Sequence, residues 1–243
     1  MRAARVVTPL ILTAHGSADP RSAANARAVA ARVARLRPGL DVRVAFCEHN
    51  SPGLGEVLDS CAGAAIVTPL LLADAYHARV DIPGQIAACG VGDLVRQAGV
   101  LGEDDRLVSV LRHRVVELGV SRLDDSVGVL VVAIGSSNPV ANARTAAVAP
   151  RLAAGTRWAA VATAFATHTE PSLDEAVDEL RSQGAGRVVI APWFLAPGRI
   201  PDRVERFARG AGAAMAAPLG AHRLVAATVL DRFDQAAAQR IAA

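Results

Sequence analysis

The sequence contains no lysine, and all 26 of its basic residues are arginines. A single arginine therefore says less about function here than it does in a chain that also uses lysine. Aromatic residues make up only 3% of the chain and the net charge is only +3. No dense stripe of arginines and aromatics is present, so we expect no nucleic-acid partner.

Cysteine and long apolar runs are also scarce. Cys47, Cys61 and Cys89 are odd in number and lack Cys-x-x-Cys spacing, which argues against a disulfide framework or an iron–sulfur cluster. No apolar run approaches the length of a membrane span, and the one after Arg5 leads into a polar turn without a cleavage pattern. These absences predict a soluble, cytoplasmic protein with no membrane partner.

Short apolar runs that resemble buried strands alternate with helical patterns along the first half. The predicted strands cover about 6–12, 41–47, 64–72 and 94–100, and the predicted helices cover about 20–36, 52–60 and 78–88. Alternation of this kind, with short connections, predicts a parallel sheet with helices on both faces.

The second half repeats this pattern. The segment that begins at Ile134 and ends in Asn138-Pro139 lies 119 residues after the segment that begins at His15 and ends in Asp19-Pro20. The same offset relates Phe46 to Phe165. The fold class is therefore α/β, with two similar doubly wound lobes produced by internal duplication, at residues 1–120 and 121–243.

Three side chains that could bind a metal occur only in the first copy. The substitutions between the copies, read along the alignment, are His15 to Ile134, Glu48 to Thr167 and His77 to Ile200. Because the second copy keeps the strand pattern without them, a purely structural role for these three residues is less plausible. We expect the second lobe to be a scaffold without a metal centre.

His15, Glu48 and His77 each follow a predicted strand of the first lobe. Because the carboxyl ends of parallel strands meet at one edge of a sheet, the three side chains can share one crevice. Two imidazoles and one carboxylate suit a divalent ion such as Fe²⁺, Co²⁺, Ni²⁺ or Zn²⁺ and leave coordination positions open. His49 is a fourth candidate, although in an extended backbone it would point away from Glu48. The remaining histidines, interpreted as ordinary surface or packing residues, are His113, His168 and His222.

Several motifs together resemble the sirohydrochlorin chelatases, which insert Fe²⁺ or Co²⁺ into sirohydrochlorin. They are Thr13-Ala14-His15-Gly16-Ser17, Phe46-Cys47-Glu48 before Pro52, the run from Pro69 to His77 followed by Asp81-Ile82-Pro83, and Leu219-Gly220-Ala221-His222-Arg223-Leu224. The resemblance covers nearly the whole chain. It implies a metal chelatase of siroheme or cobalamin biosynthesis, with His15, Glu48 and His77 as catalytic and metal-binding residues.

The resemblance also implies the substrates. These are a divalent metal, either Fe²⁺ or Co²⁺ with Ni²⁺ as a further candidate, and a tetrapyrrole that carries many carboxylates; no organic cofactor is implied. Arginines at the crevice rim suit such carboxylates. The expected substrate-binding residues are Ser17, Arg21, Tyr76, Arg79 and Arg199.

Two other functions remain open on the sequence alone. The same residues would also serve a non-catalytic carrier of metal or tetrapyrrole. A metal-assisted hydrolase is a third interpretation, but no matching nucleophile motif is present.

Overall fold

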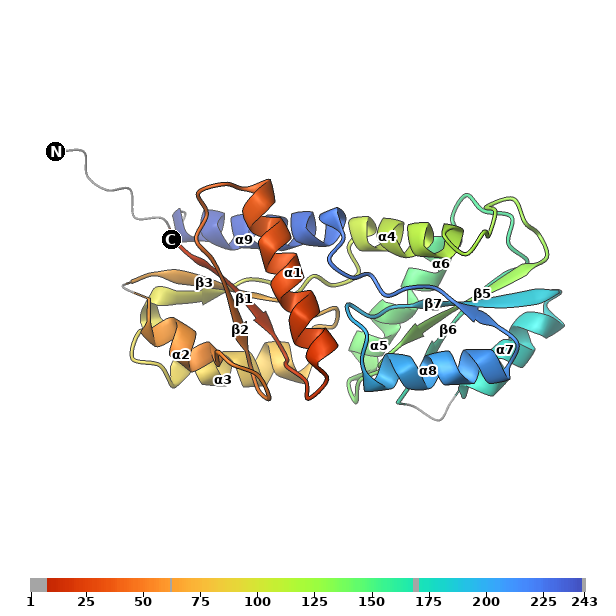
Figure 1. The fold of residues 1–243 in the computed structure, drawn as a ribbon, viewed down its shortest axis with the longest axis horizontal. Helices are drawn as coiled ribbons and strands as arrows, with labels where there is room; N and C mark the ends of the chain where they lie inside the picture. Colours follow the sequence, from red (N-terminus) through yellow and green to blue (C-terminus); the bar gives the residue numbers. More distant parts are fainter. Residues whose placement is uncertain (1–7, 62, 168–170, 242–243) are drawn as a thin grey trace. The chain divides into compact units, whose positions relative to one another are not determined.

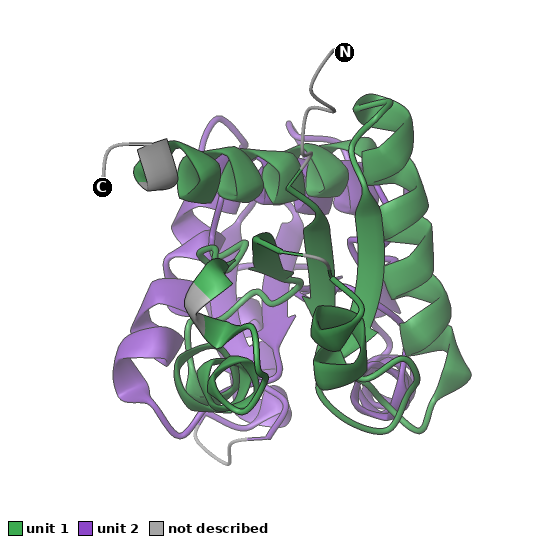
Figure 2. Ribbon diagram, turned by 90° about the vertical axis from the view of Figure 1, so that its left-hand side faces the viewer, with its two compact units in different colours: residues 1–102, 223–243 green, residues 103–222 purple. Residues whose placement is uncertain are grey.

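The computed structural model describes residues 8–61, 63–167 and 171–241. The chain forms two compact units, each with its own four-stranded parallel sheet (Figures 1 and 2). Unit 1 comprises residues 1–102 and 223–243, and unit 2 comprises residues 103–222. Both sheets have the same strand order, which confirms the predicted pair of similar α/β lobes.

Unit 1 has the sheet order β2-β1-β3-β4, so that β1 lies in the centre with a parallel neighbour on each side. Helices α1 and α9 cover one face of this sheet, and α2 and α3 cover the other (Figure 1). The elements of unit 1 are β1 (Leu10–Ala14), α1 (Pro20–Leu36), β2 (Val42–Phe46), α2 (Leu54–Asp59), β3 (Ala65–Pro69), the π-helical turn η1 (His77–Asp81), α3 (Ile82–Ala87), the short η2 (Gly92–Leu94), β4 (Val95–Gln97) and α9 (Arg223–Ile241).

Unit 2 repeats this arrangement with the order β6-β5-β7-β8. Its elements are α4 (Asp105–Val116), β5 (Val127–Ala133), α5 (Pro139–Ala146), α6 (Val148–Ala153), β6 (Ala160–Phe165), α7 (Leu173–Ser182), β7 (Arg187–Pro192), α8 (Arg199–Gly210) and β8 (Ala214–Met215). Helices α4 and α6 pack on one side of the sheet. Helix α7 packs against β6 and helix α8 against β7, and their buried side chains form one apolar cluster with those of the strands. No helix of the described ranges in either unit is both long and apolar enough to cross a bilayer.

The closing helix of each repeat packs on the sheet of the other repeat. Helix α4 follows the first repeat in sequence but packs against β7 and α6 of unit 2, whereas α9 packs against α1 and β3 of unit 1. The compact units therefore do not follow the expected boundary between residues 120 and 121. The physical reason is that each sheet covers its apolar face with the closing helix that comes from the other repeat.

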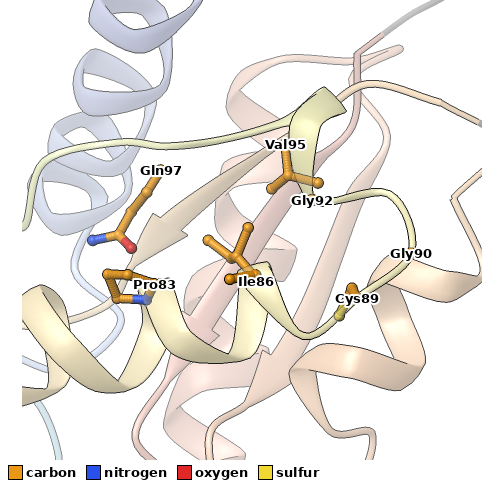
Figure 3. Close-up of a pocket in the computed structure, with 8 residues that line it drawn as sticks. Pro83, Ile86, Cys89, Gly90, Gly92, Val95 and Gln97 are labelled. Carbon is orange, nitrogen blue, oxygen red and sulfur yellow. The ribbon is translucent and has the colours of Figure 1, made fainter.

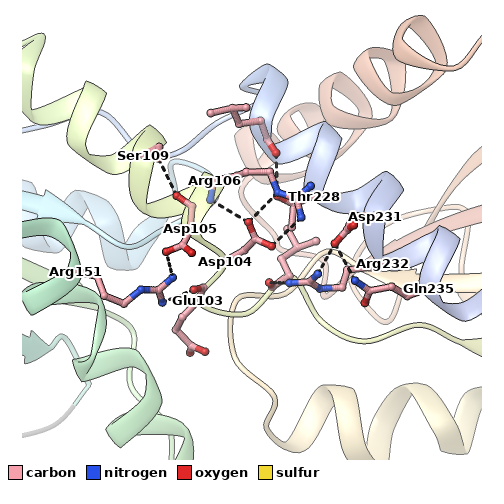
Figure 4. A network of polar contacts seen from close by, with 12 residues as sticks. Glu103, Asp104, Asp105, Arg106, Ser109, Arg151, Thr228, Asp231, Arg232 and Gln235 are labelled. Atoms are coloured by element: carbon pink, nitrogen blue, oxygen red, sulfur yellow. Dashed lines mark hydrogen bonds and ion pairs between the residues drawn. The ribbon is translucent and has the colours of Figure 1, made fainter. Parts of the chain in front are cut away.

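One arginine on each closing helix anchors this exchange. Arg232 of α9 donates to the carbonyls of Val100 and Leu101 in unit 1, at 2.9 and 3.0 Å. Its guanidinium also pairs with Asp231 at 2.7 Å (Figure 4). Arg114 of α4 donates to the carbonyl of Leu219 in unit 2, at 3.4 Å. Arg114 and Arg232 occupy matching positions of the repeat, so the exchange is built in the same way in both units.

The first strand and helix show how the local sequence positions the site. Strand β1 is fully buried and runs to Ala14, two residues beyond the predicted end; the start predicted at Val6 lies outside the described residues. The predicted helix from Pro20 to Leu36 is confirmed as α1. Asp19 caps it by accepting from the backbone N–H of Arg21, and Pro20 fits the first turn, where its missing N–H costs nothing. The loop between Ala14 and Asp19 is thereby fixed at both ends.

Candidate functional site

The loops after β1 and β2 touch each other at His15 and Glu48. The backbone N–H of Glu48 donates to the carbonyl of His15 at 3.0 Å. Gly16 has a φ of +98°, and a Cβ atom placed there would lie 1.8 Å from the carbonyl oxygen of Glu48. Only glycine allows this close approach together with this backbone conformation.

The two side chains also meet. Nε2 of His15 lies 3.3 Å from Oε1 of Glu48, and Nδ1 of His15 lies 3.0 Å from the carbonyl oxygen of Gly16. Both ring nitrogens thus face oxygen acceptors, whereas a neutral imidazole has only one N–H to donate. The nitrogen without the proton keeps a lone pair, with which an imidazole can accept a proton or bind a metal.

His77 completes the predicted group and lies eight residues after the last residue of β3. It is the first residue of η1, and its ring centroid lies 3.9 Å from that of His15 with the two ring planes at 82°. Its Nδ1 lies 3.2 Å from Oδ2 of Asp81. The structure therefore brings His15 next to both Glu48 and His77. No three His, Cys, Asp or Glu side chains within residues 8–61, 63–167 and 171–241 are arranged so that they could hold a metal ion together.

His49 differs from the expectation that it would point away from Glu48. Its φ of +62° is a left-handed conformation, so the backbone is not extended there. The side chain turns back, and its Nε2 lies 3.2 Å from the same Oε1 of Glu48 that His15 approaches. One carboxylate oxygen is therefore shared by two imidazoles.

Cys47 precedes Glu48 at the end of β2 and is not a reactive thiol. Burial, with smaller contributions from the Asp81 and Glu48 carboxylates, raises the pKa of Cys47 to about 12. At neutral pH the thiol is thus protonated, and the thiolate that would bind a metal is not formed.

Two of the expected substrate-binding residues lie in the same loops. The backbone N–H of Ser17 donates to Oδ1 of Asn50 at 2.8 Å, and its hydroxyl accepts from the N–H of Asp19. Ser17 thus braces the loop between β1 and α1. Tyr76 is 65% exposed beside His77, with ring centroids 5.7 Å apart.

The three expected arginines have different surroundings. Arg21 donates two hydrogen bonds to the Asp19 carboxylate, from Nε to Oδ1 at 3.0 Å and from Nη2 to Oδ2 at 2.6 Å. Arg79 donates from Nη2 to Oδ2 of Asp74 at 2.7 Å. The hydrogen bond to Asp74 raises the pKa of the Arg79 guanidinium above its ordinary value. Arg199 is exposed at the first residue of α8 in unit 2. A substrate carboxylate at Arg21 or Arg79 would therefore compete with an existing ion pair.

Three residues at the site were given no role from the sequence, although Asp81 belongs to one of the motifs quoted above. Asn50 holds Ser17, Asp81 contacts His77, and Gln85 donates to Oδ1 of Asp81 at 2.8 Å. The spacing of His77, Asp81 and Gln85 at intervals of four residues was visible in the sequence and is the pattern of one helix face. For Asn50 the sequence held no comparable signal.

The remaining histidines have partners of their own. In unit 2, Nε2 of His113 lies 3.3 Å from Oε1 of Glu117, and the ring of His113 lies 6.2 Å from that of His222. His168 lies outside the described residues.

A separate cavity of about 640 Å³ opens beside α3 and β4 of unit 1 (Figure 3). Its lining residues are Pro83, Ile86, Ala87, Cys89, Gly90, Gly92, Val95 and Gln97. None of the predicted site residues lines it, so this cavity and the histidine pair are distinct features of the unit.

Unit 2 keeps the backbone of the site without its side chains. The N–H of Thr167 donates to the carbonyl of Ile134 at 3.0 Å, as Glu48 does to His15, and the Thr167 hydroxyl donates to the same oxygen. Ile134 is 47% exposed and, like Ile200, offers no donor atom to a metal. The matching position of the second unit is thus an apolar surface.

The chain is similar to known proteins along both repeats. The sequence model of the CbiX family matches residues 9–118 and again residues 128–236. A sirohydrochlorin ferrochelatase from Priestia megaterium is 29% identical over 208 residues, which cover 81% of this chain and 76% of that protein. A sirohydrochlorin cobaltochelatase from the same species is 26% identical over 219 residues, which cover 82% of this chain and 68% of that protein.

Solved structures show the same fold. SirB from Bacillus subtilis with Fe³⁺ matches with a TM-score of 0.83 and 22% identity, covering 98% of each chain. The SirB sirohydrochlorin chelatase from Bacillus subtilis subspecies spizizenii in complex with cobalt matches with a TM-score of 0.77 and 21% identity, covering 95% of each chain.

Proposed function

This chain belongs to the CbiX family of sirohydrochlorin chelatases, and we propose that it inserts a divalent metal, Fe²⁺ or Co²⁺, into sirohydrochlorin. The reaction exchanges two pyrrole N–H protons for one metal ion. The site must therefore hold a metal briefly and accept protons close to where the metal is held. We assign both tasks to His15, Glu48 and His77; since the three side chains are not arranged around one point among the described residues, two of them at a time would hold the metal.

The observation that carries this assignment is the position of His15. Its Nε2 is 3.3 Å from Oε1 of Glu48, while its Nδ1 is already engaged by the carbonyl of Gly16. Two ligand atoms about 2.1 Å from one ion lie about 3.0 to 3.4 Å apart for angles between 90° and tetrahedral. The gap between Nε2 and Oε1 thus has the width that a shared metal ion requires.

His77, at the start of η1, supports the same assignment. Its ring stands edge-on to the ring of His15, and its Nδ1 is engaged by Asp81. Nε2 of His77 remains as the nitrogen for a metal or a pyrrole proton. An imidazole near neutral pH can serve in either role.

The tetrapyrrole is held by the surroundings of this pair. Tyr76 and Val80 are exposed apolar side chains on either side of His77 in sequence and suit the flat face of the ring. Ser17, Arg21 and Arg79 are the proposed partners of the peripheral carboxylates, for which arginine forks have the right geometry. Arg199 belongs to unit 2, and its role stays an expectation from the sequence.

The proposal includes both Fe²⁺ and Co²⁺ as substrates, with Ni²⁺ as a further candidate, and no organic cofactor. The donor set of imidazole and carboxylate suits all three ions. We also propose a cytoplasmic location, where the three free thiols Cys47, Cys61 and Cys89 stay reduced.

A stoichiometric carrier is the competing function, and turnover separates the two. Wild-type protein is incubated anaerobically with a large excess of sirohydrochlorin and either metal, and the loss of free sirohydrochlorin absorbance is followed. A chelatase converts many equivalents per chain. A carrier stops at one equivalent, and that result would reject the proposal.

A further inference from the structure

We infer that Asp81, supported by Gln85, is a positioning residue that fixes the orientation and the tautomer of His77; the use of this tautomer in metal insertion rests on the function proposed above. Oδ2 of Asp81 lies 3.2 Å from Nδ1 of His77. Because a carboxylate only accepts hydrogen bonds, this contact places the imidazole proton on Nδ1. Nε2 then keeps its lone pair for a metal ion or a proton.

Gln85 holds the carboxylate in place from one turn further along the helix. Its Nε2 donates to Oδ1 of Asp81 at 2.8 Å and to the carbonyl of Cys47 at 3.3 Å. Cys47 directly precedes Glu48, and its own N–H donates to the carbonyl of Ala14, next to His15. The polar chain from His77 through Asp81 and Gln85 thus ends on the strand terminus that carries Glu48.

The π-helical turn η1 runs from His77 to Asp81, the two residues whose side chains are in contact. The N–H of Ile82 donates to the carbonyl of His77, five residues earlier. The helix of unit 2 begins in the same way, because Arg79 N–H donates to Ala75 and Asp202 N–H donates to Gly198. After these N–H donors, the next fully buried residue is Ile82 in unit 1, three residues after Arg79. In unit 2 it is Val204, only two residues after Asp202. Unit 1 therefore contains one additional residue between His77 and Ile82, and π-turns of this kind occur often at functional sites.

Unit 2 shows how the helix is linked to the strand end when no imidazole is present. With Ile82 matched to Val204, Arg203 occupies the position of Asp81, and Ala166 occupies the position of Cys47. Arg203 donates to the carbonyl of Ala166, so a single side chain links the helix to the strand end. The mechanical link is kept in unit 2 without a carboxylate. In unit 1 the carboxylate is thus explained by the imidazole that it contacts.

The tautomer of His77 can be measured directly. In ¹⁵N-histidine-labelled protein at about pH 8.5, well above the ordinary imidazole pKa, long-range ¹H–¹⁵N couplings distinguish Nδ1–H from Nε2–H. The His77→Gln spectrum identifies which of the six histidine signals belongs to His77. We expect His77 of the wild type to carry its proton on Nδ1. An Nε2–H tautomer in the wild type overturns the inference without any variant of Asp81.

The matched variants are Asp81→Asn and Asp59→Asn. Asn is nearly isosteric with Asp and can either accept or donate, so Asp81→Asn should give a mixture of tautomers at His77. Loss of such an outer partner typically lowers activity about 10- to 100-fold, and we expect this loss in kcat with little change in melting temperature. Asp59 is exposed at the end of α2, so Asp59→Asn should change neither readout.

The outcomes distinguish this inference from the proposed function. An unchanged Nδ1–H signal in Asp81→Asn would overturn the positioning role, even if the enzyme is active. A wild type that inserts no metal would reject the proposed function, while the NMR spectra would still decide whether Asp81 sets the tautomer.

Discussion

The backbone N–H of Glu48 donates to the carbonyl of His15, and Thr167 donates to Ile134 in the same way in unit 2, both at 3.0 Å. The contact between these two strand ends is thus a property of the fold and does not depend on the side chains. The first repeat uses it to bring an imidazole and a carboxylate together. The second repeat has isoleucine and threonine at the same two places.

His15→Ala and His77→Ala should each abolish most metal insertion and leave the fold intact. The second unit folds with isoleucine at both positions, so the change in the free energy of unfolding should stay at about 1 kcal/mol. Anaerobic insertion kinetics and thermal melts on the same samples test this. Variants that kept wild-type rates, or that were inactive only because they unfolded, would contradict it.

Glu48→Gln should slow insertion about as much as His15→Ala. The amide keeps the size of the side chain but removes the negative charge that faces Nε2 of His15. Loss of a group that takes part in proton transfer typically costs about 10²- to 10⁴-fold in rate. A loss of only a few-fold would show that the carboxylate takes no part in proton transfer.

Gly16→Ala should destabilise the protein far more than Gly39→Ala. Both glycines have positive φ, at +98° and +87°. A Cβ at Gly16 would overlap the carbonyl of Glu48, whereas nothing lies within 4 Å of a Cβ at Gly39. We expect about 1 kcal/mol at Gly39 from backbone strain and about 3 kcal/mol or more at Gly16. Equal losses in denaturant titrations would show that the two loops can separate at little cost.

Arg232→Ala should destabilise unit 1, because it leaves the carbonyls of Val100 and Leu101 without their donor. A hydrogen bond from a charged group contributes about 1.5 to 3 kcal/mol to stability. We therefore expect the free energy of unfolding to fall by about 2 kcal/mol. Arg35 is exposed near the end of α1, and Arg35→Ala should change stability by less than about 0.5 kcal/mol. Denaturant unfolding of both variants measures the difference, and similar values would argue against the anchor.

The thiol of Cys47 should resist alkylation in the native protein. Its pKa is raised from 9.0 to about 12, so the folded state holds its proton while the unfolded state releases it. The stability contributed by this neutral thiol is complete below pH 9 and is lost as the pH rises from about 9 towards 12. Mass spectrometry after iodoacetamide treatment at pH 9 should find Cys47 modified only in denatured protein. Rapid labelling of native Cys47 would contradict the shift.

The sequence was sufficient to predict the repeat, because the repeat depends on the strand patterns. It also singled out candidate site residues among those that follow the strands, and their role stays a prediction. His15, Glu48 and His77 stood out because unit 2 lacks them. In the structure His15 directly follows β1 and Glu48 lies two residues after β2, whereas His77 begins η1, eight residues after β3. Asp81 was within reach as well, since it lies four residues after His77.

The exchange of closing helices was not predictable from the sequence. Helices α4 and α9 follow equivalent loops, so the local pattern does not say which sheet each one covers. The orientation of His49 was missed for a different reason: its φ of +62° is unusual for a residue other than glycine. The rule that successive side chains point to opposite faces holds only where the backbone is extended.

The most direct test of the metal site compares wild-type protein with His15→Ile, the residue that unit 2 carries at this position. Initial rates of sirohydrochlorin loss are measured anaerobically with Fe²⁺ and with Co²⁺, at enzyme concentrations far below that of the tetrapyrrole. The wild type should turn over many times with at least one metal, and His15→Ile should fall to the rate without enzyme while its melting temperature stays close to that of the wild type. Equal multiple-turnover rates for the two proteins would contradict the proposed metal site.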